Sequence, residues 1–185
     1  MIVDNDVYVR LDNLTSALRP MANVTRFFAG QVWQHQYGRP LRPQRDVDLK
    51  NYLPWKLWPH RDFPPVAIGP HYLMSHDCVE FITRNKESLR GVGTLEDVSI
   101  SVWLRAYGVT PEHVKWFSNA KNFGCLDGVV SLSDLSITAI RKIHENVKNG
   151  DPFCHGMEVD VDSMDGTDNS GAQWKKQNET SIIVE

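Results

Sequence analysis

The sequence predicts an α/β fold on two observations. Short apolar segments with strand character recur along the chain, and amphipathic runs with apolar residues three or four positions apart lie between them. The predicted strands cover 1–3, 26–33, 66–68, 72–74 and 114–117, and the predicted helices cover 7–18, 76–85, 96–108 and 133–149. The 185 residues suffice for one domain with a real core and show no internal repeat.

The first elements follow from local spacing. Met1–Val3 is typical of the end of a buried strand, and the next three residues leave it in a turn. Val7, Leu11, Leu14 and Leu18 then share one helical face that Pro20 ends.

The strand at 26–33, which contains Gly30, precedes an irregular stretch from 34 to 65. This stretch is rich in Pro, Arg and aromatic residues. Two interpretations stay open: an ordered loop that lines a binding site, or a surface loop with half-buried aromatic side chains.

The later elements surround a turn predicted at Gly69-Pro70-His71. Ser75 is expected to cap the following helix, with Val79 and Ile82 facing inward. Ile140, Ile143 and Val147 define the buried face of the last helix, and Gly150 ends it. Residues 156–185 are polar and partly acidic, so we predict a disordered tail.

Two acidic clusters are candidate functional sites. Glu96 and Asp97 open a predicted helix, where Thr94 and Asp97 match a T-x-x-D capping box, and the alternative is that Asp97 is a general base. Asp4-Asn5-Asp6 follows a strand, where Asp and Asn either form a turn or provide hard oxygen ligands for a divalent ion. We expect the two clusters to face one another across one active site.

Composition excludes several classes. The net charge of −3 and pI of about 6.2 show no nucleic-acid footprint, and no apolar run reaches the roughly 18–20 residues of a membrane span. Cys125 and Cys154 flank the last helix and are expected to form a disulfide, with Cys78 free. Together with N-x-[ST] sequons at Asn13, Asn23 and Asn178, this favours the secretory pathway.

The order of these motifs resembles the β-1,3-glycosyltransferase superfamily that includes the galactosyltransferases, glycosyltransferase family 31. Val3–Val9 looks like its D-D-D strand end, Phe63–Pro65 with Gly69–Ser75 like its Y-P-x-y-x-x-G-x-G-Y-v-l-S segment, and Leu95–Ser99 like its E-D-V signature. Gly124-Cys125 and Cys154 match the closing segment of some members. The resemblance covers residues 1–154 and is greatest to members that build proteoglycan linkers or add N-acetylgalactosamine.

The resemblance implies a GT-A-type sheet flanked by helices, a UDP-sugar donor, Mn²⁺ and a Golgi membrane protein anchored by a signal-anchor. Its activity would be inverting β-1,3 transfer of a hexose, galactose or an N-acetylhexosamine, to a glycan or glycoprotein acceptor in protein glycosylation. We therefore expect 1–155 to be part of the catalytic domain. The nucleotide-binding half and the anchor would precede it, and this piece alone would be inactive.

The resemblance also implies roles for individual residues. Asp97 would deprotonate the acceptor hydroxyl and Glu96 would orient donor or acceptor, while Asp6 would bind Mn²⁺ directly and Asp4 through ribose or water. Trp58 and Tyr72 would either stack on sugars or pack in the core. His113 would either reach the metal or lie on the surface.

Three positions depart from the family pattern: Asn5 in the acidic cluster, His71 in place of a glycine, and Ser101 where glycine is frequent. These changes favour one alternative, an inactive glycosyltransferase-like binding protein or truncated fragment. The other alternative is an unrelated metal-dependent phosphoryl-transfer enzyme. It lacks support because the sequence has no Gly-rich phosphate loop.

Overall fold

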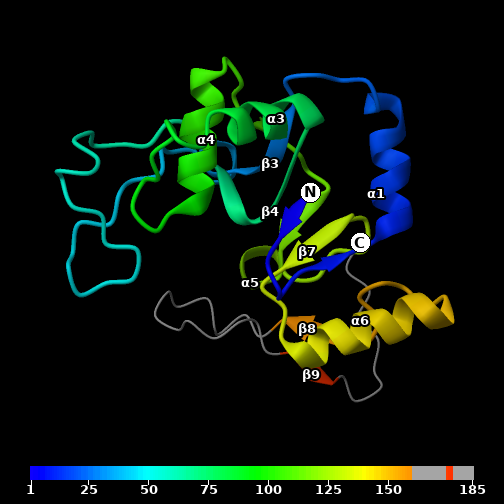
Figure 1. Ribbon diagram of the computed structural model, residues 1–185. Coiled ribbons are helices and arrows are strands. Elements are labelled where there is room, and N and C mark those ends of the chain that lie inside the picture. The colour runs from blue at the N-terminus through cyan, green and yellow to red at the C-terminus, as the bar shows by residue number, and fades with distance from the viewer. Residues whose placement is uncertain (160–173, 177–185) are drawn as a thin grey trace. The chain divides into compact units, whose positions relative to one another are not determined.

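The computed structural model describes residues 1–159 and 174–176, which form mixed α/β structure (Figure 1). The chain divides into two compact units. Unit 1 comprises Met1–Val3 and Ala17–Lys115, and unit 2 comprises Asp4–Ser16 and the chain from Trp116 onward. The single partial domain predicted for 1–155 stays a prediction, and each unit is described by itself.

Unit 1 is built on a four-stranded sheet. Its strands are, in spatial order, β1 (Ile2–Val3), β4 (Ala67–Met74), β3 (Phe28–Val32) and β5 (Glu112–His113). Neighbours run antiparallel except for the parallel β3–β5 pair, and the register between β3 and β4 shifts between Gly30 and Val32. All five residues of β3 are buried, so this strand is central to the unit.

Two expectations for this sheet are wrong. The strand at the start of the chain is exposed, with Val3 42% accessible, because β1 is an edge strand. The turn predicted at Gly69-Pro70-His71 is instead the middle of the continuous strand β4. His71 pairs with Val3 of β1, and the irregular register with β3 falls across this stretch, between the pairs Val32–Ala67 and Gly30–Tyr72.

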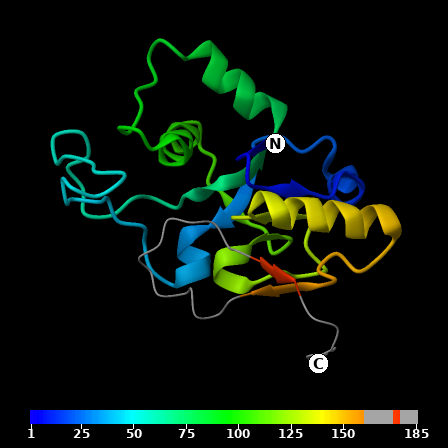
Figure 2. The same cartoon turned by 90° about the horizontal axis from the view of Figure 1, so that it is seen from below.

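Helices α3 (His76–Arg84) and α4 (Glu96–Ala106) pack on the same face of β3 and β4 (Figures 1 and 2). Their shared core contains Phe28, Tyr72, Cys78, Ile100 and Leu104. Ile82 packs against this core as predicted, whereas Val79 is 47% exposed and Cys78 takes the inward position.

The segment after β3 begins with a short helix, α2 (Trp33–Tyr37), and is otherwise irregular up to β4. It is nevertheless anchored by its own core, in which Leu53, Phe63 and Val66 pack with Val92 and Val98. A 3₁₀ turn, η1 (Arg19–Met21), lies before β3.

Unit 2 contains the sheet β2 (Tyr8–Val9), β7 (Ser131–Ser133) and β6 (Phe117–Asn119), in that spatial order. The helices that begin in this unit are α1 (Leu11–Leu18), α5 (Ala120–Phe123) and α6 (Ile137–Asn149). Leu132 of β7 and Ile143 of α6 are fully buried and pack with Ala139 and Phe153.

Several boundaries in unit 2 differ from the prediction. Tyr8 and Val9 form a strand, and α1 starts only at Leu11 and has no buried residue, so its expected apolar face is not a core face. Residues 114–116 are not a strand. The last helix starts at Ile137, because residues 131–133 pair with β2 and β6 instead.

The end of α6 agrees with the prediction, since Gly150 is left-handed with φ 77°. Ile143 is buried on the expected face, while Val147 is 44% exposed. The expected pair Cys125–Cys154 is joined by a disulfide with a Cα–Cα distance of 5.7 Å, and Cys78 is buried and in no disulfide.

Within the predicted tail, β8 (Met157–Val159) pairs antiparallel with β9 (Trp174–Lys176) (Figure 2). Residues 160–173 and 177–185 of that tail, and with them the sequon at Asn178, lie outside the described residues. No helix in the described ranges is both long and apolar enough to span a membrane.

Candidate active site

Asp97 lies in the first turn of α4 and links this helix to β4. Its Oδ2 accepts a hydrogen bond from the Gly69 backbone N–H at 3.0 Å, and its Oδ1 accepts one from the Val98 N–H at 2.7 Å. The carboxylate therefore satisfies one free N–H of the helix start and one of the neighbouring strand.

The predicted capping box is wrong. The N-cap of α4 is Leu95, which makes no side-chain cap bond, and Thr94 is exposed. A tight turn accounts for the difference: Gly93 has φ 57°, and the Leu95 N–H donates to the Val92 carbonyl. This turn moves Thr94 out of the cap position.

Ser99 holds that turn in place. Its hydroxyl donates to the Leu95 carbonyl at 2.5 Å and accepts from the Val92 N–H at 2.8 Å. The last residue of the E-D-V-S stretch thus fixes the loop directly before Asp97, a role that the sequence analysis missed.

The environment of Asp97 suits a base. Burial raises the pKa of this carboxyl above its ordinary value, the Glu96 charge raises it further, and the hydrogen bonds from Val98 and Gly69 lower it. The net direction is upward, so desolvation outweighs the backbone donors. A carboxylate with a raised pKa holds a proton more strongly and is a better general base near neutral pH.

Glu96 is exposed and accepts a hydrogen bond from the Tyr72 hydroxyl. Tyr72 itself is fully buried in the core of unit 1, so of its two interpretations core packing is correct. Trp58 is half-buried, packs against the core around Phe63 and donates its ring N–H to the Asp62 carbonyl at 3.2 Å. It is also a packing residue.

Asp97 lines a pocket of about 340 Å³ within unit 1. Half-buried Trp33 and Ile68 form part of its lining, and the irregular segment contributes Arg42, Gln44, Lys50 and Asn51. Asn51 has φ 66°, an unusual conformation for a non-glycine residue that is frequent at functional sites. Of the two interpretations of residues 34–65, this geometry favours the binding-site loop.

The second predicted cluster lies in unit 2. Asp4 is exposed and Asp6 half-buried, and among the described residues the Oδ1 atom of Asp6 is buried without a hydrogen-bond partner. Whether this cluster faces Asp97 of unit 1 stays a prediction.

Asp134, which the sequence analysis missed, lies close enough to Asp6 for their charges to interact. Burial raises the pKa of Asp134, and the negative charge of Asp6 raises it further. Asp134 also accepts a hydrogen bond from the Asn119 side chain and has φ 58°. No local motif in the sequence predicts that Asp134 lies near Asp6. The two residues come together because β7 pairs with both β6 and β2.

The acidic residues of unit 2 fit a divalent cation in their chemistry. A buried carboxylate oxygen without a donor and a second carboxylate nearby are the features that a hard cation compensates. In the described part of the chain, no three His, Cys, Asp or Glu side chains are grouped to hold a metal. A cation at Asp6 would need further ligands from elsewhere.

The two remaining candidates are histidines. His71 is fully buried in β4, its Nε2 lies 3.1 Å from Gln31 Oε1, and burial lowers its pKa to about 3. This departure from the family pattern therefore places a ring inside unit 1, where it is fully enclosed. Ser101, another departure from the family pattern, is buried in α4.

His113 is more than a surface histidine. Its Nδ1 accepts from the Val32 N–H at 3.1 Å, and its ring stacks on His35 with centroids 5.2 Å apart. Burial lowers its pKa, and the nearby charges of His35 and Lys115 lower it further. The ring is thus fixed to β3.

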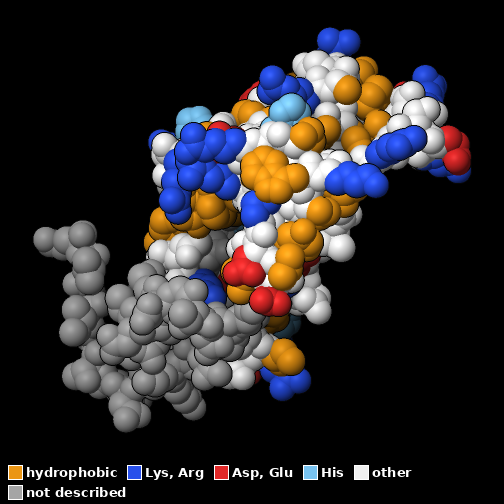
Figure 3. Space-filling model, turned by 90° about the vertical axis from the view of Figure 1, so that its left-hand side faces the viewer, with side chains coloured by type: hydrophobic (Ala, Val, Ile, Leu, Met, Phe, Trp, Pro, Cys, Tyr) orange, Lys and Arg blue, Asp and Glu red, His pale blue; other side chains and the backbone are white. Residues whose placement is uncertain are grey.

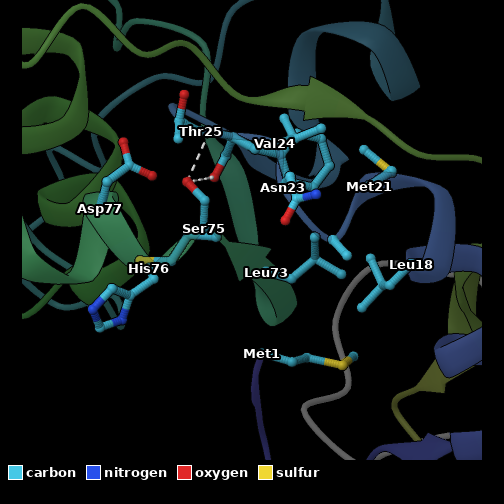
Figure 4. Close-up of a pocket in the computed structure, with 13 residues that line it drawn as sticks. Met1, Leu18, Met21, Asn23, Val24, Thr25, Leu73, Ser75, His76 and Asp77 are labelled. Atoms are coloured by element: carbon cyan, nitrogen blue, oxygen red, sulfur yellow. Dashed lines mark hydrogen bonds between the residues drawn. The ribbon is translucent and has the colours of Figure 1, made fainter.

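A second pocket in unit 1, of about 400 Å³, lies at the start of α3 (Figure 4). Its wall is largely apolar, with Met1, Leu73 and Val24 among the lining residues, and Ser75 bonds to the Phe27 backbone. None of the predicted site residues lines it, so the pocket at Asp97 is the better candidate.

Unit 1 thus combines a desolvated carboxylate with a pocket of polar and aromatic side chains, where a general base could act. Comparison with known proteins agrees: the Galactosyltransferase family model matches residues 1–115. The chain belongs to this galactosyltransferase family.

Among its relatives, β-1,3-galactosyltransferase GALT1 of Arabidopsis thaliana is 31% identical over 134 residues, 70% of this chain and 20% of that protein. Hydroxyproline O-galactosyltransferase GALT6 of the same plant is 27% identical over 71% of this chain and 19% of its own length. β-1,3-galactosyltransferase 1 of Homo sapiens is 34% identical over 65% of this chain and 36% of its own length. The chain spans about a fifth to somewhat over a third of the length of these relatives.

Proposed function

We propose that this chain forms part of an inverting β-1,3-galactosyltransferase of the GT-A type, which transfers galactose from a UDP-sugar to a glycan or glycoprotein acceptor. The names of the relatives support galactose among the hexoses considered. The single observation that carries the proposal is Asp97, a carboxylate of raised pKa that opens into a pocket and is held by two backbone N–H groups.

In the proposed reaction, Asp97 takes the proton of an acceptor hydroxyl as its oxygen attacks the anomeric carbon of the sugar. The new glycosidic bond forms as the bond to UDP breaks, and the electron pair leaves with the diphosphate. Glu96, held by the Tyr72 hydroxyl, orients a substrate hydroxyl beside Asp97. The Gly69 and Val98 N–H groups fix the direction of the base.

Asp6, with Asp4, would hold Mn²⁺, which supplies positive charge to the leaving diphosphate when bound. The oxygen of Asp6 that lacks a partner supports this role. The disulfide fits an oxidising compartment, in accordance with the proposed location on the lumenal side of the Golgi membrane. The burial of His71 removes one reason to regard the protein as an inactive binding protein.

The test is Asp97→Asn in the longer protein that contains this chain, with UDP-galactose, Mn²⁺ and an acceptor panel. The variant keeps one acceptor oxygen but loses the base, so transfer should fall by about 10²–10⁴-fold. Binding of UDP should stay near its normal value, and the melting temperature should not fall.

Asp12→Asn is the matched control, because Asp12 is an exposed carboxylate in the first turn of α1. It should leave transfer unchanged. Near-normal transfer by Asp97→Asn would return Asp97 to a structural role.

A further inference from the structure

The pocket at Asp97 has a cationic wall. Arg42 and Lys50 both line it, and both side chains are exposed. Within the described part of the chain, Lys50 has no ion pair. Arg42 uses its Nε for one bond to Asp62 at 3.1 Å, and this pair is exposed to solvent at 60% and 37%. Such an exposed pair is weak and leaves the outer guanidinium nitrogens for another anion.

The irregular segment of residues 34–65, which supplies both cations, also carries a net positive charge. Residues 34–65 contain six Arg and Lys against three Asp, a net charge of +3 with neutral His, whereas the whole chain carries −3. Figure 3 views the side on which this loop projects in Figure 1 and shows Lys and Arg side chains interspersed with hydrophobic ones.

Not every cation of the loop is available. Arg45 donates to the carbonyls of Leu53, Trp58 and His60, and its guanidinium lies 3.9 Å from the Trp55 ring centroid. It holds the loop in shape. Arg42 and Lys50 do not hold the loop in this way.

The other groups of the pocket suit a sugar. Trp33 offers an aromatic ring, and Gln44 and Asn51 are amides that hydrogen-bond to hydroxyl groups. A neutral sugar would need only these and Asp97. Two cations in the same pocket as a base complement a ligand that has both a reacting hydroxyl and a negative group.

We propose, on the basis of the function above, that the acceptor is an anionic saccharide. Its carboxylate or sulfate would be bound by Arg42 and Lys50 while its hydroxyl meets Asp97. Guanidinium and carboxylate or sulfate oxygens form charge-assisted, often bidentate, hydrogen bonds. Arg42 and Lys50 are thus specificity-determining residues for the acceptor.

The experiment compares three disaccharide acceptors with the longer protein: one ending in glucuronic acid, one in 6-sulfated galactose, and one in neutral glucose. The better of the two anionic acceptors should exceed the neutral one in kcat/KM by about tenfold or more, the range of charge-assisted bonds. Whichever anionic sugar is preferred identifies the source of the charge.

The double variant Arg42→Gln/Lys50→Gln should lose this preference, so that its kcat/KM values for the anionic and neutral acceptors become similar. Lys56→Gln/Arg61→Gln is the matched control, because both residues are exposed in the same loop and neither lines the pocket. It should keep the preference, which added salt should weaken in the wild type.

Equal use of neutral and anionic acceptors would overturn the proposal. So would a selective loss of UDP affinity in the double variant, because the cations would then serve the donor. If no acceptor is used, the proposed function fails, and calorimetric binding of the three saccharides decides this inference separately. A preference for an anionic saccharide that the double variant loses supports it, and the lack of such a preference contradicts it.

Discussion

The N-termini of α4 and α6 differ in how they satisfy their first N–H groups. At α6 in unit 2, the Ser136 hydroxyl accepts from the Ala139 N–H at 3.1 Å, and the first turn has no acidic residue. At α4 in unit 1, the N-cap residue Leu95 makes no side-chain hydrogen bond to the helix start, and Glu96 and Asp97 occupy the first turn.

This difference separates a helix start that is stabilised by a neutral cap from one that holds a buried carboxylate. A serine cap stabilises a helix without burying a charge. Asp97 benefits from the helix dipole, yet burial still raises its pKa, so its charged form is held at a cost in stability. A helix that only needed a cap would not require a buried carboxylate, which supports a chemical role at α4.

The largest expected effect on stability comes from the disulfide that holds α6, which extends the comparison between the two helices. The Cys125–Cys154 disulfide closes a loop with a sequence separation of 29 that contains α6, whereas α4 has no such link. Replacing both cysteines by serine should cost unit 2 about 3–4 kcal/mol of unfolding free energy, because the unfolded chain gains freedom.

Denaturant unfolding with and without a reducing agent measures this cost. The reductant should destabilise the wild type and leave the double variant unchanged. An unfolding curve of the wild type that does not respond to complete reduction would contradict the prediction.

A smaller effect tests the two helix starts directly. Ser136→Ala should cost about 1 kcal/mol, because the Ala139 N–H loses its partner. Thr94→Ala is the matched change at α4 and should stay within about 0.5 kcal/mol, since Thr94 is exposed and caps nothing. Thermal unfolding of both variants decides the matter, and equal costs would restore the capping box at Thr94.

The smallest effect is the pH dependence that Asp97 adds to stability. Its folded-state pKa is raised, so the stability that it contributes is complete at pH values below the unfolded pKa and is lost as the pH rises through the folded pKa. The Asp97→Asn variant does not lose stability in this way as the pH rises, because Asn does not ionise. The variant should therefore gain stability relative to the wild type as the pH rises above about 4, the pKa of an unfolded Asp.

Melting temperatures of both proteins across this range provide the measurement. If the variant were instead less stable near pH 7, the bonds to Gly69 and Val98 would outweigh the burial of the charge. The contrast between α4 and α6 would then disappear.

The sequence alone located most helices and the family motifs. Helical periodicity and glycine stops are local signals, and they gave the positions of α3 and α4 and the end of α6 at Gly150. The E-D-V stretch placed Glu96 and Asp97 at a helix start, and Cys125 and Cys154 are paired as expected.

Only the tertiary structure decided what these residues contact. Gly69 meets Asp97 because β4 continues through a predicted turn, and Asp134 lies near Asp6 because β7 pairs within a sheet that the local pattern did not indicate. Arg42 and Lys50 share a pocket with Asp97 because an irregular loop folds on its own core. Strand pairing and loop packing depend on partners far apart in the chain, and such partners leave no periodic signal in the sequence between them.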